Sequence, residues 1–135
     1  MSRSAWYIGC RQEEVGEAAI LVGDRARIDR IAEHLERPTF LEENRGLRTV
    51  TGWRSGRRVT ASAFGMGGPI AAIVLHELFD LGVRRFVRVG TAMVMPPAKL
   101  GDWCWRTAQC AAKEPRVRML RSVILRSAIS ISALR

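Results

Sequence analysis

The sequence has few cysteines and no long apolar run, and both shortages exclude whole classes of protein. The three cysteines, Cys10, Cys104 and Cys110, are odd in number and show no metal-ligand spacing. We therefore expect reduced thiols, with neither a disulfide framework nor a metal site. No apolar run is long enough to span a bilayer, and the first residues lack the apolar segment of a signal peptide. These absences predict a cytoplasmic protein with no membrane partner.

Acidic residues are also scarce, with 13 against 22 basic residues and a formal net charge of +9. Such a charge is typical of nucleic-acid binders. Most of the excess lies from Trp103 onward, where six arginines and Lys113 oppose a single acidic residue, Glu114. That segment lacks the interleaved aromatic residues on which bases would stack. We expect no nucleic-acid partner; a basic binder remains an alternative that a salt-dependent DNA mobility shift would test.

Strand and helix signals alternate over the first 102 residues, which suit one domain with a modest core. We expect strands at 18–22, 48–53, 57–63 and 86–89, and helices at about 25–35 and 69–81, in the order β-α-β-β-α-β. Pro38 ends the first helix, and a polar connection follows at 41–47. Because one strand pair is a hairpin and the other strands are separated by helices, we predict a three-layer α/β/α fold with a mixed, twisted sheet.

Two of the predicted strands end beside arginines. Gly23 joins the first strand to a helix, and Arg27 in the first helical turn opposes the helix dipole unless an anion lies between them. Arg88 interrupts an apolar strand that ends just before Thr91, and a buried arginine needs a partner. Ligands of open α/β sheets bind beyond the carboxyl ends of strands, so these four residues predict an anion site. The alternatives are a surface arginine after an ordinary turn and an edge strand with Arg88 in solvent.

A third turn, Gly65-Met66-Gly67-Gly68-Pro69, precedes the second helix. Its glycines allow the backbone to approach a ligand closely. It is not the dinucleotide-binding glycine pattern, because proline follows and the acidic partner is absent. A tight turn with no ligand is the alternative. His76 in the following helix has no carboxylate–nucleophile pair beside it, so we interpret it as a packed or solvent-edge residue.

In order and spacing, these motifs resemble the nucleoside phosphorylase family, of the uridine phosphorylase and hexameric purine nucleoside phosphorylase type. The resemblance runs from about residue 7 to residue 102, over the segments 20–27, 44–45, 65–69, 81–91 and 101–102. It implies cleavage of a nucleoside by inorganic phosphate into free base and ribose 1-phosphate. Phosphate would be the co-substrate, with no other cofactor. The resemblance also implies a homo-oligomer built of dimers, often a hexamer.

Residue by residue, the resemblance implies roles for seven positions of this chain. Phosphate would be bound by Gly23, Arg27, Arg45, Arg88 and Thr91, with Arg88 as the catalytic group. Arg45 would reach the phosphate site of a neighbouring subunit. The nucleoside would contact Tyr7, Met66 and Thr91.

The sequence also departs from the family pattern. Tyr7 stands where the family has a histidine, and Ala92 and Met93 replace a threonine and a glycine, so the base preference stays open. The family's second half, with its base-recognition and ribose-binding residues, has no counterpart here. We therefore expect a uridine phosphorylase-like chain that is incomplete and weakly active or inactive. The alternatives are a non-catalytic fragment that binds phosphate only, or a purine nucleoside phosphorylase or nucleosidase of the same fold. The arginines favour a phosphorylase, because a hydrolase has no use for a phosphate site.

We expect residues 1–102 to be the N-terminal part of a nucleoside phosphorylase domain, and residues 103–135 to be an aberrant, frame-shifted basic tail. The tail has no clear helical or strand period. Read from the third base of the Trp103 codon, permitted codons encode Val, Leu and then a phosphorylase-like run.

Sequencing the gene beyond codon 102 tests this expectation. The result should be an open frame, displaced by one base, that encodes a phosphorylase-like continuation. An early stop codon in that frame, or an unrelated translation, contradicts it.

Overall fold

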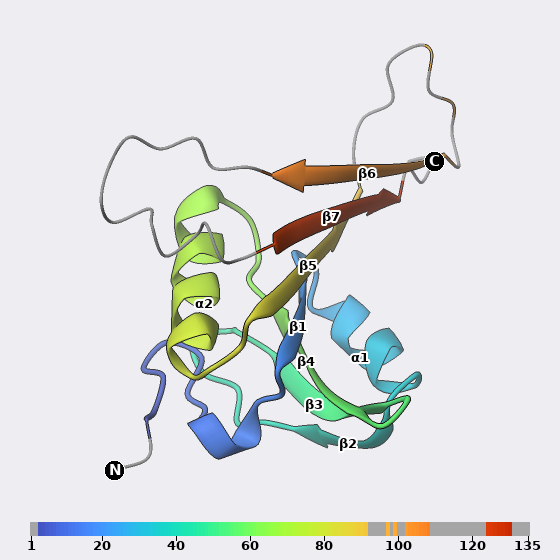
Figure 1. Cartoon of the computed structure of the whole chain (residues 1–135). Coiled ribbons are helices and arrows are strands. Elements are labelled where there is room, and N and C mark those ends of the chain that lie inside the picture. Colours follow the sequence, from blue (N-terminus) through green and yellow to red (C-terminus); the bar gives the residue numbers. More distant parts are fainter. Residues whose placement is uncertain (1–2, 92–96, 98, 100–101, 109–123, 131–135) are drawn as a thin grey trace.

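The computed structural model describes residues 3–91, 97, 99, 102–108 and 124–130. These residues form a mixed sheet with one helix on each face (Figure 1). In spatial order its strands are β2 (Glu36–Phe40), β3 (Thr49–Arg54), β4 (Arg57–Ala63), β1 (Ala18–Val22), β5 (Arg85–Gly90), β7 (Ile124–Ser130) and β6 (Trp103–Ala108). The helices are α1 (Ala26–Ala32), α2 (Gly68–Asp80) and a short 3-10 turn, η1 (Gln12–Glu14).

Three parallel strands form the part of the sheet that matters for function. β1 lies between β4 and β5 and pairs with both in parallel, so that Val22 is aligned with Ala63 on one side and with Val89 on the other. The three strands therefore end at the same edge of the sheet. The antiparallel hairpin of β3 and β4 turns at Ser55 and Gly56, both with positive φ, as the twist of a tight hairpin requires.

Side chains of β1 alternate between two cores because successive residues of a strand face opposite sides of the sheet. Ala19 and Leu21 pack in the cluster that includes Val74 and Leu78 of α2. Ile20 and Val22 pack with Ile28 and Ala32 of α1, on the other face. The sheet thus has a helix-covered core on each side, which confirms the predicted α/β/α layers.

A buried set of hydroxyl groups joins β3 to β4. The hydroxyl oxygens of Thr49 and Ser62 lie 2.9 Å apart, as do those of Thr51 and Thr60, and all four residues are buried. Thr60 Oγ1 also accepts the backbone N–H of Gly16 at 2.8 Å. Every one of these hydroxyls has a partner, which removes the cost of burying it.

The segment after α1 differs from the prediction. The helix ends at Ala32 rather than near Leu35, and the connection predicted from 41 is preceded by a strand, β2, so the order is β-α-β-β-β-α-β. β2 is an edge strand exposed along its whole length, and its pairing with β3 shifts register near Pro38, where Arg37 has φ +51. An edge strand tolerates proline, and an exposed strand carries no alternation of apolar residues. Pro38 lies inside β2 and not at the end of α1, so the prediction that it ends the helix is wrong.

Two strands follow residue 102. β7 pairs in parallel with β5 and antiparallel with β6, so both extend the same sheet beyond β5 (Figure 1). The boundary that we predict at residue 102 is the point in the gene where the reading frame would shift. It stays a prediction, as does the frame shift itself.

We predict that Thr60→Val will lower the free energy of unfolding by about 1–3 kcal/mol, because it leaves the buried Gly16 N–H without its acceptor and Thr51 without its partner. Urea unfolding followed by circular dichroism measures the change. Thr39→Val, on the exposed strand β2, is the control and should have little effect. Equal stability of Thr60→Val and the parent chain would contradict the role assigned to the hydroxyl set.

Candidate functional site

A cleft of about 890 Å³ lies at the edge where β4, β1 and β5 end. Its wall is built by the segments that follow the three strands. The lining residues are Gly23, Asp24, Arg25 and Arg27 after β1, Phe64, Gly65, Met66, Gly67, Gly68 and Ala71 after β4, and Arg88, Gly90 and Thr91 of β5 and its end. The structure thus brings together four of the predicted phosphate residues, Gly23, Arg27, Arg88 and Thr91.

Close approach of two turns explains the glycines at the base of the cleft. The backbone N–H of Phe64 donates to the carbonyl of Val22 at 3.0 Å, which continues the parallel pairing into the turns. A Cβ on Gly23 would lie 3.1 Å from the carbonyl oxygen of Gly65, closer than side chains normally come. Gly65 and Gly67 have φ +74 and +108, values that favour glycine. A larger residue at these positions would alter the shape of the cleft.

Arg88 is held at the cleft by its strand and by an aromatic ring. Its guanidinium carbon lies 5.7 Å from the ring centroid of the buried Phe64. The alternative that Arg88 lies on an edge strand is wrong, because β5 pairs with β1 and with β7. The side chain is nevertheless exposed, since it lines the open cleft. In the described part of the chain, no acidic group lies within ion-pair distance of Arg88.

The cleft is electropositive. Its lining contains Arg25, Arg27 and Arg88 but one acidic residue, Asp24. The Oδ1 atom of Asp24 accepts the backbone N–H of Ala26 at 3.0 Å, so this carboxylate is engaged at the start of α1. Three guanidinium groups converge here with the first turn of α2, where Gly68 is followed by Pro69 and no acidic side chain occurs. An anion is the ligand that such a surface favours.

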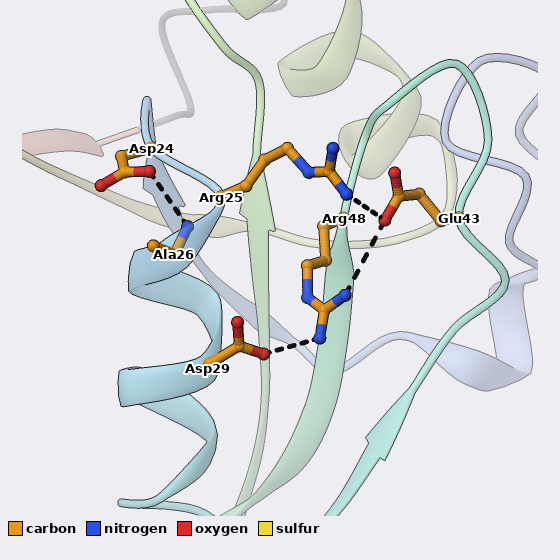
Figure 2. Close-up of polar contacts among 6 residues, drawn as sticks. All are labelled: Asp24, Arg25, Ala26, Asp29, Glu43 and Arg48. Carbon is orange, nitrogen blue, oxygen red and sulfur yellow. Dashed lines mark hydrogen bonds and ion pairs between the residues drawn. The ribbon is translucent and has the colours of Figure 1, made fainter.

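Sequence reasoning missed Arg25, although it lines the cleft. Its Nη2 atom lies 2.6 Å from Oε2 of Glu43, and Arg48 approaches the same oxygen at 3.8 Å (Figure 2). Arg48 also pairs with Asp29 of α1 at 2.6 Å. The four residues form an alternating chain of charges that runs from Arg25 at the cleft wall to Asp29 of α1. The signal in the sequence is a second arginine beside Gly23-Asp24, which by itself resembles any surface arginine.

Tyr7 and Arg45 lie outside this cleft, and the structure places them beside each other. The guanidinium carbon of Arg45 lies 5.0 Å from the ring centroid of Tyr7 and 5.3 Å from that of Trp6, which is 71% exposed. Arg45 has φ +53 in the turn between Asn44 and Leu47. The structure therefore does not bring these two residues to the cleft that holds Gly23, Arg27, Arg88 and Thr91.

A single carboxylate fixes the segment that carries Tyr7. Glu77 of α2 accepts the backbone N–H groups of Trp6, Tyr7 and Ile8 at 3.0, 2.8 and 2.9 Å. The side-chain amide of Asn44 donates to the carbonyl of Trp6 at 2.8 Å. The residues around Tyr7 and Arg45 are therefore held by α2 and by each other.

The Cys10 thiol is not reactive, and the described residues include no set of metal ligands. Burial, and then the negative charges of Glu14 and Glu77, raise the pKa of the Cys10 thiol to about 12, so it stays protonated at neutral pH. Among the described residues no cluster of histidine, cysteine and acidic side chains is suited to a metal ion. No helix in that part of the chain is both long and apolar enough to cross a membrane.

Residues 17–109 match the model of the phosphorylase superfamily. The chain belongs to this superfamily. It is 39% identical over 92 residues to the uridine phosphorylase of Treponema pallidum and 40% identical over 88 residues to the DeoD-type purine nucleoside phosphorylase of Clostridium perfringens. The crystal structure of purine nucleoside phosphorylase from Toxoplasma gondii in complex with immucillin-H matches it with a TM-score of 0.73 and 32% identity. These matches confirm the predicted family and fold.

The matched region is a limited part of each relative. It covers 68% of this chain but 36% of the Treponema protein, and 64% of this chain but 37% of the Clostridium protein. For the Toxoplasma structure the shares are 78% and 43%. The chain of this phosphorylase-superfamily member therefore spans well under half the length of these relatives. The roles predicted for its individual site residues remain predictions.

Proposed function

We propose that the protein is the phosphate-binding part of a nucleoside phosphorylase, of the uridine phosphorylase type. The reaction would convert a nucleoside and inorganic phosphate into free base and ribose 1-phosphate, with no cofactor other than the phosphate. The observation that carries the proposal is the convergence of arginines on one cleft at three parallel strand ends. This chain alone would be weakly active or inactive, because it spans little more than a third of its uridine phosphorylase relatives.

Phosphate would sit between the strand ends of β1 and β5. Arg27 and Arg88 supply two planar guanidinium groups that bind phosphate oxygens in pairs, and Thr91 supplies a hydroxyl. Gly23 allows the backbone to come close to the anion. Hydrogen bonds to charged groups contribute roughly 1.5–3 kcal/mol each, so a few of them hold a dianion firmly.

The bound phosphate would act as the nucleophile. One of its oxygens forms a bond to C1′ of the ribose while the C1′–N bond breaks, and the base leaves with the electron pair and takes up a proton. Positive charge develops on the ribose in the transition state, and a fixed phosphate beside it lowers the barrier by position and by charge. Arg88 is the proposed catalytic residue, because it would hold that phosphate from the end of β5.

The nucleoside would contact Met66 and Thr91 in the cleft. Met66 is 96% exposed and lines the cleft wall, where a ribose or base would cover it. Tyr7 and Arg45 would complete the site of a neighbouring copy, because the half-buried Tyr7 and the exposed Arg45 lie beside each other, away from their own cleft. The proposal therefore includes a homo-oligomer, and we place the enzyme in the cytoplasm.

A second candidate is a protein that binds phosphate and does not catalyse. The short coverage of the relatives favours it, since the matched part carries the phosphate cleft and the relatives extend well beyond it. A hydrolytic nucleosidase is disfavoured by the arginines, which water as nucleophile would not require. The base that the enzyme accepts stays open, because both uridine and purine nucleoside phosphorylases are among its relatives.

We predict that Arg88→Ala will weaken the binding of inorganic phosphate by about 2 kcal/mol or more, which is about 30-fold, because it removes a charged hydrogen-bond partner from the cleft. Isothermal titration calorimetry at constant ionic strength measures the affinity. The control is Arg57→Ala, an exposed arginine of the β3–β4 hairpin that does not line the cleft. Unchanged affinity in Arg88→Ala would remove Arg88 from the site.

The release of base from uridine and from inosine, with and without phosphate, separates the two candidate functions. We expect phosphate binding with little or no turnover from this chain alone, and any turnover should require phosphate. Base release that is equal without phosphate would indicate a nucleosidase and contradict the proposal.

A further inference from the structure

Arg25 is the cleft arginine for which the proposed reaction has no role so far. It lines the same wall as Arg27 and Arg88, two residues before Arg27 in the chain. Its side chain is 53% exposed, and its guanidinium group forms an ion pair with the carboxylate of Glu43 (Figure 2). Because Arg25 lines this cationic cleft, it lies in the region where an anion would bind.

Glu43 has two cationic partners. Its Oε2 atom receives Arg25 at 2.6 Å and lies 3.8 Å from Nη1 of Arg48. Arg48 is anchored independently of Glu43, by Asp29 at 2.6 Å and by the ring of Phe40, whose centroid lies 4.8 Å from its guanidinium carbon. If Arg25 moved away, Glu43 would still face a fixed guanidinium group.

We propose that Arg25 is the third phosphate-binding arginine of its own chain's cleft, beside Arg27 and Arg88, and that Glu43 holds it while the cleft is empty and releases it when the anion binds. This inference rests on the proposed phosphate site. Arg48 keeps the charge of Glu43 compensated after the exchange. Arg25 is then a binding residue, and Glu43 is the group that competes with phosphate for it.

The exchange is favourable on physical grounds. A solvent-exposed ion pair contributes little to stability, because water screens it and both side chains lose freedom. A doubly charged phosphate already held by two other arginines offers Arg25 a more negative partner, with more acceptor oxygens. Ordered hydrogen bonds to such an anion are stronger than the exposed pair that is lost.

The proposal predicts that two substitutions change the affinity for phosphate in opposite directions. Arg25→Ala should weaken the binding of inorganic phosphate about tenfold, because one charged hydrogen-bond partner is lost. Glu43→Gln should strengthen it several-fold, since the competing carboxylate is gone. The double variant should bind like Arg25→Ala alone, because Glu43 acts only through Arg25. Arg25→Lys should fall between the parent chain and Arg25→Ala, since lysine keeps the charge without the planar fork.

The measurement is calorimetric titration of the 135-residue chain with inorganic phosphate at fixed ionic strength. Arg57→Ala is the control, because it removes an exposed arginine of the β3–β4 hairpin that does not line the cleft and should leave the affinity unchanged. Circular dichroism of each variant checks that the fold is kept.

Two results would overturn the inference while leaving the phosphate site intact. One is unchanged affinity in Arg25→Ala when Arg88→Ala binds weakly. The other is weakened binding in Glu43→Gln, which would show that Glu43 merely fixes Arg25 in place. If Arg88→Ala also binds normally, or the parent chain binds no phosphate, the proposed phosphate site itself is wrong, and the role of Arg25 is lost with it.

Discussion

The parallel pairing of β1 with its two neighbours is the constraint on which the rest of the site depends. Because the register aligns the last residues of β4, β1 and β5, the three segments that follow them must leave the sheet at the same edge. Gly23 and Gly65 then let two of these turns approach closely, and Arg88 reaches the same space from β5. A change in the register of β5 by one residue would turn the side chain of Arg88 to the other face of the sheet.

The concentration of positive charge in this cleft is tolerable because of how it is arranged. Arg88 rests over an aromatic ring and stays in contact with solvent, so its charge does not carry the cost of full burial. Arg25 is paired with Glu43, which lowers the mutual repulsion of the three guanidinium groups while no anion is present. The ion pair of Arg25 and the solvent contact of Arg88 therefore both lower the cost of gathering three positive charges in one cleft.

The segment 43–45 connects the cleft to the surface that carries Tyr7 and Arg45. Glu43 pairs with Arg25 just before α1 and with Arg48 just before β3, while the next residue, Asn44, is bound to the N-terminal segment. Glu77 fixes that segment on α2 through three backbone N–H groups. Arg45 thus follows two anchored residues, although it is itself exposed. Such preorganisation suits a residue that must enter the site of another molecule, as our proposal requires.

The sequence by itself determined the parts that depend on local chemistry. Apolar runs of strand length specified β1 and β5, the turn residues specified the β3–β4 hairpin and the start of α2, and strand ends located Gly23, Arg27, Arg88 and Thr91. Only the tertiary structure decided the rest. β2 forms because β3 offers it an edge, not because of its own exposed residues. Arg25 and Glu43 are 18 residues apart, and Tyr7 and Glu77 are 70 apart, so their contacts follow from which surfaces the fold brings together. Charged surface residues carry no periodic signal, and their partners are fixed only when the chain has folded.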